Sequence, residues 1–152
     1  MIDAIQTVEP HDLEQLRQFT ERIIVAEKVT GDPALQAELI HNVHQNLDWG
    51  LANREHCCHL KYTRDGRIVA VVLVKNFWNL CSLFVTPELH RQGIGRALIL
   101  AAVQHCRALS ERPSIRLNSA PNAVAFYAAL GFQPAESTRT LPPGFRAMAL
   151  RL

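Results

Sequence analysis

The pattern of apolar residues predicts two amphipathic helices in the first third of the chain. Over residues 10–27, apolar side chains recur at helical spacing. They are Leu13, Leu16, Phe19, Ile23 and Ile24. Gly31 interrupts the pattern, and Asp32-Pro33 restarts it as a cap followed by a first-turn proline, with a second stripe running to Leu47. Residues 2–8, ahead of both helices, are typical of a short strand.

From residue 56 onward the pattern becomes mainly that of strands. Residues 68–74 are apolar on both faces, which indicates a central strand, and Arg64-Asp65-Gly66-Arg67 has the composition of a hairpin turn before it. Further strands are expected at 56–63, 80–85, 114–118, 132–133 and 145–152, and helices at 95–109 and 121–130, the last closed by Gly131. This order predicts an α/β (α+β) fold in which about four helices flank a mixed sheet of about seven strands, with residues 1–152 forming one domain.

Composition and charge narrow the class of protein. Of 152 residues, 16 are Lys or Arg and 14 are Asp or Glu, which leaves a formal charge of +2 without a basic run. We therefore expect neither a nucleic-acid nor a membrane partner. Four irregularly spaced cysteines do not form a disulfide framework, and no apolar stretch reaches the ~18 residues of a membrane span. Because the first residues also lack a signal-peptide pattern, the expectation is a reduced, cytoplasmic, soluble protein.

Residues 83–98 carry the strongest chemical signal. An expected strand enters a loop with Gly93 and Gly95, and the loop leads directly into an expected helix. Glycines let a ligand approach the backbone closely, and the first amides of a helix have no partners within it. Such a loop binds phosphate, and Arg91 and Arg96 add positive charge. A loop that simply caps a helix is the alternative.

Two common phosphate motifs do not fit these residues. A dinucleotide-binding loop requires a third small residue where Leu98 stands, and it opens the first strand–helix unit of its domain, whereas this loop comes late. A Walker loop requires Gly-Lys-Ser/Thr, which the segment lacks.

The segment resembles the cofactor motif of the GNAT superfamily of acyl-CoA-dependent N-acetyltransferases. That motif has Val-x-Pro followed by Gln/Arg-x-x-Gly-x-Gly/Ala, and this chain has Val85-Thr86-Pro87 followed by His90-Arg91-Gln92-Gly93-Ile94-Gly95. It departs at His90, where the family prefers Gln or Arg. Downstream, Phe126-Tyr127-Ala128-Ala129-Leu130-Gly131-Phe132 resembles the family's second motif, in the family's order and at a usual separation.

The resemblance implies a site for acetyl-CoA as cosubstrate, without a metal. Backbone groups of the strand would pair with the pantetheine arm, and amides of the loop would hold the pyrophosphate. The implied cofactor-binding residues are Leu83, Phe84, Val85, Arg91, Gln92, Gly93, Ile94, Gly95, Arg96 and Asn118, with Asn122 as an alternative to Asn118. The family's asparagine lies seven residues before its tyrosine, where this chain has Ala120.

The resemblance further implies direct attack of an amine on the thioester, with Tyr127 as the catalytic residue. A phenol can protonate the departing thiolate. The alternative for Tyr127 is a core aromatic beside Phe126 and Phe132. No acidic residue occurs in residues 80–85 or 114–118, where the family often carries one, and the general base is unassigned.

Other chemically suggestive residues are interpreted as structural. His56-Cys57-Cys58-His59 invites a zinc interpretation, but side chains on a strand alternate between its faces and cannot enclose one ion. Cys81 lies among apolar residues and is expected in the core rather than as a nucleophile. The aromatic residues Trp49, Phe77 and Trp78 flank the central strands, where packing is the expected role.

Two functions follow from this pattern. The first is an N-acetyltransferase acting on a primary amine of a small molecule or peptide. The second is a non-catalytic acyl-CoA-binding sensor or regulatory module, which the absence of an acidic residue in the two strands leaves open, whereas Tyr127 favours the enzyme. The identity of the amine and the oligomeric state, a homodimer included, are left open.

Overall fold

The computed structural model describes residues 1–28 and 30–152, which contain seven strands and four α-helices. The strands are β1 (Asp3–Thr7), β2 (Cys57–Arg64), β3 (Arg67–Lys75), β4 (Asn79–Val85), β5 (Ser114–Ser119), β6 (Gln133–Pro134) and β7 (Arg146–Arg151). The helices are α1 (Leu13–Ala26), α2 (Pro33–Ala52), α3 (Ile94–Leu109) and α4 (Val124–Ala129). Short 3-10 turns precede α1, β2, α3 and α4: η1 (Pro10–Asp12), η2 (Arg54–His56), η3 (Pro87–Leu89) and η4 (Pro121–Ala123).

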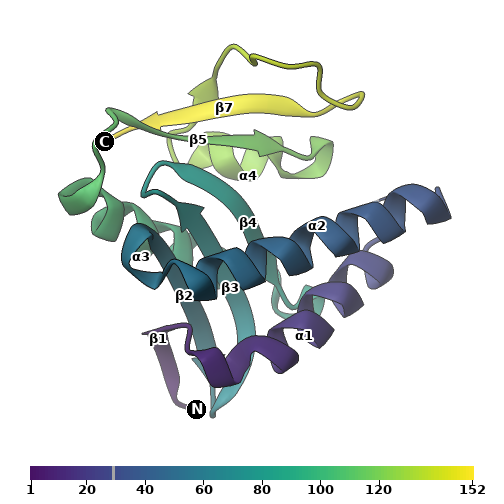
Figure 1. The fold of residues 1–152 in the computed structure, drawn as a ribbon, viewed down its shortest axis with the longest axis vertical. Coiled ribbons are helices and arrows are strands. Elements are labelled where there is room, and N and C mark those ends of the chain that lie inside the picture. The colour runs from purple at the N-terminus through teal and green to yellow at the C-terminus, as the bar shows by residue number, and fades with distance from the viewer. Residues whose placement is uncertain (29) are drawn as a thin grey trace.

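The strands form a single mixed sheet in the order β1-β2-β3-β4-β5-β7-β6. All neighbours are antiparallel except β4 and β5, which are parallel. This confirms the predicted fold class, and β3 lies inside the sheet as its apolar faces predicted. In Figure 1, α1 and α2 cross one face of β2, β3 and β4, while α3 and α4 lie behind the sheet.

Local sequence explains how the main elements begin and end. Asp32 caps α2 by accepting a hydrogen bond from the Ala34 amide at 2.9 Å, and Pro33 occupies the first turn. Asp65 and Gly66 turn the β2–β3 hairpin with positive φ values of 52° and 79°. Leu109, the last residue of α3, is 52% exposed, so the apolar contacts of this helix end before its last residue.

Two apolar cores lie on opposite faces of the sheet. The larger packs α3 and Tyr127 of α4 against β2–β5 and β7, and the smaller packs α1 and Leu47 of α2 against Ile68 and Val71 of β3. No helix in the described ranges 1–28 and 30–152 combines the length and apolar character needed to cross a bilayer.

A small polar cluster is buried beneath α1 and α2. The Lys61 ammonium of β2 binds the Asp12 carboxylate at 2.7 Å, and their side chains are only 10% and 5% exposed. His59, two residues earlier on the same face of β2, is 5% exposed, and both of its ring nitrogens lack hydrogen-bond partners in the described chain. Its ring packs so closely on Gly50 that a β-carbon there would stand 2.8 Å from His59 Nδ1. The histidine is therefore closely confined, without a hydrogen-bond partner for its ring among the described residues.

Burial lowers the pKa of His59 from 6.5 to about 4, although the Asp12 charge acts in the opposite direction. Between about pH 6.5 and 4, the imidazole is protonated in the unfolded chain but neutral in the folded protein. The free energy of unfolding should therefore fall as the pH drops through this interval.

We predict that His59→Leu removes most of this pH dependence of stability, which amounts to roughly 3 kcal/mol across the interval. Urea unfolding at several pH values measures it. His56→Leu, at an exposed neighbour, should keep the slope, and an unchanged slope in His59→Leu would refute the assignment.

Candidate functional site

The edge of β4 that faces β5 is largely unpaired. The two parallel strands share one register pair, Asn79 with Arg116, supported by a 2.7 Å hydrogen bond from the Arg116 amide to the Trp78 carbonyl. Beyond it, towards the C-terminal end of β4, the ladder between the two strands ends in the described chain. Figure 1 shows β4 bending away from β5. A β-bulge contributes to this bend, because Ser82 pairs with Leu73 and Leu80 with Val74, which leaves Cys81 as the extra residue.

The strand register identifies which backbone groups this edge presents. Val85 lies opposite Ala70, and the Thr86 amide donates to the Val69 carbonyl at 2.9 Å. That bond marks Val85 and Ala70 as a non-hydrogen-bonded pair, so the N–H and C=O of Val85 point away from β3. By the same alternation, the groups of Leu83 face the unpaired edge, whereas those of Phe84 face β3. We call the backbone groups of Leu83 and Val85 the free edge of β4.

Phe84 was predicted to bind the cofactor together with Leu83 and Val85, but its backbone groups face the opposite side of the strand. Its backbone is used in the β3 ladder, and its side chain packs against the core beneath α1 and α2. Because a strand alternates its backbone groups as well as its side chains, the predicted cofactor contacts of β4 narrow to Leu83 and Val85.

The phosphate loop, residues 90–96, follows η3 and joins β4 to α3. Arg91 and Gly93 both have left-handed backbones, with φ of 64° and 81°. Glycine adopts this conformation freely, but it is unfavourable for arginine, so the loop holds a strained residue next to the helix start. Gly93 is the N-cap of α3, and Ile94 anchors the first turn in the core at 2% exposure.

The first turn of α3 presents unpartnered amides. The Ala97 amide makes the first helical hydrogen bond, to the Gly93 carbonyl at 2.9 Å, and no side chain of the described residues caps the helix. The N–H groups of Ile94, Gly95 and Arg96 therefore remain available at the positive end of a 16-residue helix. Such a helix start has the free donors and the partial positive charge that favour an anionic group.

Gly95, in the first turn of α3, lies against side chains of β4 and α4. A β-carbon at this position would stand 3.4 Å from both Val85 Cγ2 of β4 and Phe126 Cζ of α4. The Phe126 ring in turn packs edge-on against Tyr127, with centroids 5.1 Å apart. A single methyl group at Gly95 would therefore be in ordinary contact with both side chains, whereas a larger side chain would need additional space.

Tyr127 is buried at 7% exposure between Phe126 and Phe132, whose ring centroid lies 5.5 Å away. Its position is that of the core aromatic proposed as the alternative, and it belongs to the same core as Ile94 in the first turn of α3. Burial raises the pKa of the phenol, so the hydroxyl is protonated at neutral pH. No described side chain or backbone group forms a hydrogen bond with it.

The other predicted residues are more dispersed. The side chains of Arg91, Gln92 and Arg96 are exposed around the loop, and Gln92 Oε1 accepts a weak hydrogen bond from Arg64 at 3.4 Å. Asn118 lies on β5 on the face opposite Leu117, which is part of the α3 core, so its side chain points away from Tyr127. Asn122 is exposed in η4.

The residues interpreted as structural lie in several separate surroundings. In residues 1–28 and 30–152, no group of three or more His, Cys, Asp or Glu side chains is placed to hold a metal. Burial raises the pKa of the Cys81 thiol to about 11, and the thiol donates to the Leu73 carbonyl at 3.6 Å. Trp49 lies beneath the Lys75 ammonium, and Trp78 stacks with Arg112 at 3.8 Å.

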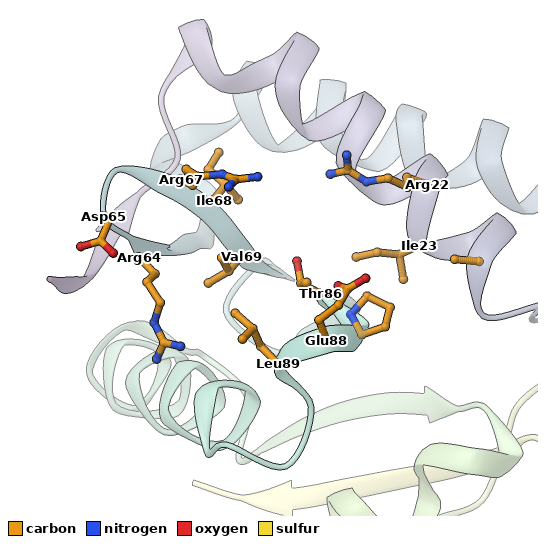
Figure 2. Close-up of a pocket in the computed structure, with 12 residues that line it drawn as sticks. Arg22, Ile23, Arg64, Asp65, Arg67, Ile68, Val69, Thr86, Glu88 and Leu89 are labelled. Carbon is orange, nitrogen blue, oxygen red and sulfur yellow. The ribbon is translucent and has the colours of Figure 1, made fainter. Parts of the chain in front are cut away.

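A cavity of about 700 Å³ lies beside the segment that enters the phosphate loop, between α1, the β2–β3 hairpin and η3. Figure 2 shows the side chains of Arg22 and Arg67 pointing towards each other across it, with Thr86 and Glu88 below. None of the predicted site residues lines this cavity. It belongs to the α1 side of the molecule, whereas Gly95 and Tyr127 belong to the α3 side.

Comparison with known proteins identifies the family. The family model described as an acetyltransferase (GNAT) domain matches residues 13–149, so the chain belongs to this family. Within the family fold, the free edge of β4 and the amides of α3 lie on the same two elements that carried the sequence resemblance.

Solved structures share the complete fold at low sequence identity. PaiA N-acetyltransferase from Thermoplasma acidophilum, determined in complex with coenzyme A, matches with a TM-score of 0.82, 16% identity and full coverage of both chains. A phosphinothricin acetyltransferase from Sinorhizobium meliloti, in complex with acetyl-CoA, has a TM-score of 0.69 and 18% identity over 100% of this chain and 89% of that one. Ribosomal-protein-S18-alanine N-acetyltransferase from Escherichia coli has a TM-score of 0.68 and 21% identity, over 99% of this chain and 94% of that one.

One curated relative was also found. UPF0157 protein YqkA from Bacillus subtilis (strain 168) is 28% identical over 81 residues, which are 51% of this chain and 24% of that protein. The match thus spans about a quarter of the relative's length.

Proposed function

We propose that the protein is an N-acetyltransferase that transfers the acetyl group of acetyl-CoA to a primary amine of a small molecule or peptide. The observation that carries the proposal is that the start of α3, with its unpartnered amides, packs at Gly95 on Val85 of the free edge and on Phe126, whose ring contacts Tyr127. The three structural neighbours support it, because two are named as N-acetyltransferases and two were determined with coenzyme A or acetyl-CoA.

In this proposal each half of the cofactor has its own backbone site. The pyrophosphate accepts hydrogen bonds from the amides of Ile94, Gly95 and Arg96, and the exposed guanidinium groups of Arg91 and Arg96 add charge. The pantetheine arm, which carries amide groups, pairs with Leu83 and Val85 as an added strand would. These backbone contacts do not depend on side-chain identity, which is why His90 can replace the family's Gln or Arg without removing them.

Acetyl-CoA supplies an activated acyl carbon, and the acceptor supplies a neutral amine. The amine nitrogen attacks that carbon, the C–N bond forms, and the C–S bond then breaks. The nitrogen loses one proton, and the sulfur of CoA ends as a thiol after gaining one. Neither β4 nor β5 carries an acidic residue, so we assign the proton of the amine to water.

We assign Tyr127 to the departing sulfur as a hydrogen-bond donor. Because burial raises the pKa of this phenol above its ordinary value of 10, complete proton transfer to a thiolate, whose pKa is lower, is uphill. A hydrogen bond to the developing negative charge requires no such transfer and is stronger in a buried setting. Tyr127 then stabilises the leaving group, and the proton reaches it from solvent.

Direct attack, without an acyl-cysteine intermediate, is the proposed route. Cys81 is the cysteine of β4, but its raised pKa of about 11 keeps it as a thiol at neutral pH.

All four cysteines are free thiols, as in a reducing compartment, and we place the protein in the cytoplasm on that ground.

We predict that Gly95→Val raises the dissociation constant for CoA at least about tenfold, because the added methyl groups occupy space next to the loop amides. The β-carbon already contacts Val85 and Phe126, so circular dichroism must first confirm that the variant is folded. Gly95→Ala, whose single methyl fits at 3.4 Å, is the matched control and should stay within about threefold of wild type. Undiminished CoA binding by folded Gly95→Val, measured by calorimetry, would show that the loop is not the pyrophosphate site.

We predict that Tyr127→Phe keeps CoA affinity and most of the stability but lowers turnover by ~10²-fold, the scale of losing one hydrogen-bond donor to a developing negative charge. Both rings should pack alike between Phe126 and Phe132, whereas Tyr127→Ala should lose roughly 3–5 kcal/mol of stability. Thiol release from acetyl-CoA over a panel of primary amines measures turnover. Full activity in Tyr127→Phe would remove the hydroxyl from the mechanism. CoA binding without thiol release for any amine would instead favour the sensor.

A further inference from the structure

His90 makes two contacts that neither its exposed position nor the family motif predicts. It follows η3, and its ring folds back so that Nε2 lies 3.0 Å from the carbonyl oxygen of Val85. The same nitrogen lies 3.3 Å from Oε1 of Glu27, the residue after the end of α1. Both contacts are to oxygen acceptors, so Nε2 must carry the hydrogen that it shares between them. Nε2–H is therefore the tautomer that the contacts define.

The Val85 carbonyl belongs to the free edge of β4. A carbonyl oxygen has two lone pairs, so the imidazole can occupy one and leave the other for an incoming strand-like ligand. His90 thereby supplies a hydrogen-bond donor to a carbonyl group that has no partner in β3 or β5. This contact holds the carbonyl in the orientation that the free edge requires.

The same contact closes the turn that leads into the phosphate loop. Within the turn, the Leu89 amide donates to the Thr86 carbonyl at 3.0 Å and the His90 amide to the Pro87 carbonyl at 3.2 Å. The His90 side chain adds a third bond, from the end of the turn back to Val85. Directly after this closure comes Arg91 with its strained left-handed backbone. A strained conformation persists where its surroundings hold it, and the closed turn provides such support on one side.

The contact with Glu27 extends the connection to the opposite layer of the fold. Glu27 lies in the segment between α1 and α2, more than sixty residues before His90 in the chain. Its side chain is 27% exposed and that of His90 is 48% exposed, so the pair is a partly solvated contact at the surface. Such pairs contribute little to global stability, and their effect is on local geometry.

We propose that His90 is a positioning residue for the cofactor. Its imidazole holds the Val85 carbonyl and the turn before Arg91 in the arrangement that binds CoA, and Glu27 holds the imidazole. The proposal rests on the proposed function, since it gives this role to the free edge and the phosphate loop. It assigns His90 a side-chain role in place of the one that Gln or Arg has in the family motif.

Substitutions at His90 separate positioning from general stability. His90→Ala should raise the dissociation constant for CoA about three- to tenfold, as expected for the loss of one hydrogen bond, and raise the KM for acetyl-CoA while leaving kcat within about twofold. His90→Gln keeps an N–H donor of similar reach and should restore affinity to within about twofold of wild type. The thermal midpoint without ligand should be nearly the same in all three proteins. His41→Ala, at an exposed position on α2, is the matched control and should bind CoA as wild type does.

A double-mutant cycle tests the role of Glu27. Glu27→Ala should weaken CoA binding in the wild-type background but have no further effect in the His90→Ala background, because it acts through the imidazole. Glu27→Gln retains an oxygen acceptor and should have a smaller effect. Additive losses in the double variant would show that Glu27 acts independently and would overturn this part of the proposal.

Calorimetry with CoA distinguishes the failure of this proposal from that of the proposed function. Wild-type affinity in His90→Ala, while Gly95→Val has lost binding, would overturn the role of His90 and leave the cofactor site in place. A lowered thermal midpoint in His90→Ala with unchanged affinity would likewise make His90 purely structural. If wild-type protein itself does not bind CoA, both proposals fall.

Discussion

The arrangement of the site depends on the loss of backbone pairing between β4 and β5. Each strand residue carries an N–H and a C=O that need partners, and unpaired groups are costly when they are removed from water. Here two parallel neighbours share a single register pair at Asn79 and Arg116, and then the ladder ends. As a result, the backbone groups of Leu83 and Val85 on this side have no partner in a neighbouring strand of the described chain. A sheet that continued its pairing would be more self-sufficient but would have no edge for a strand-like ligand.

Several neighbouring features keep this edge from closing. The bulge at Cys81 bends β4, and the Gly95 position allows the start of α3 to pack directly on Val85 and Phe126. The His90 ring covers one side of the Val85 carbonyl. Together they join the free edge, the α3 amides and Tyr127 into one region on the α3 side of the sheet. The arginine-lined cavity next to α1 has a different lining and does not take part in it.

Much of this architecture could be predicted from the sequence because it follows from local rules. The periodicity of apolar residues located the four helices and the main strands, and Asp32-Pro33, Asp65-Gly66 and Gly131 marked their ends. The phosphate loop could be recognised because its glycines, the following helix and the motif spacing lie within one short segment. The short strand β6 was correctly expected after Gly131, although only its two residues Gln133 and Pro134 pair with β7.

What could not be predicted depends on contacts between distant segments. Whether the backbone groups of Leu83, Phe84 and Val85 face β3 or the free edge depends on the register of β4 against β3, which all residues of the two strands determine together. The contact of His90 with Glu27 joins residues that are adjacent only after α1 has packed on the sheet. The unpartnered ring of His59 depends on Gly50 of α2 in the same way. Single-residue patterns carry no signal for such pairs.

Amide hydrogen exchange measured by NMR, with and without saturating CoA, tests whether CoA pairs with the free edge of β4. The N–H groups of Leu83 and Val85 point to the free edge, whereas that of Phe84 already faces β3. The account predicts that CoA slows exchange at Leu83 and Val85 and at Ile94, Gly95 and Arg96, while Phe84, protected from the start, changes little. Bound CoA that leaves exchange at Leu83 and Val85 unchanged would contradict the account, because the free edge would then not be the site of pairing.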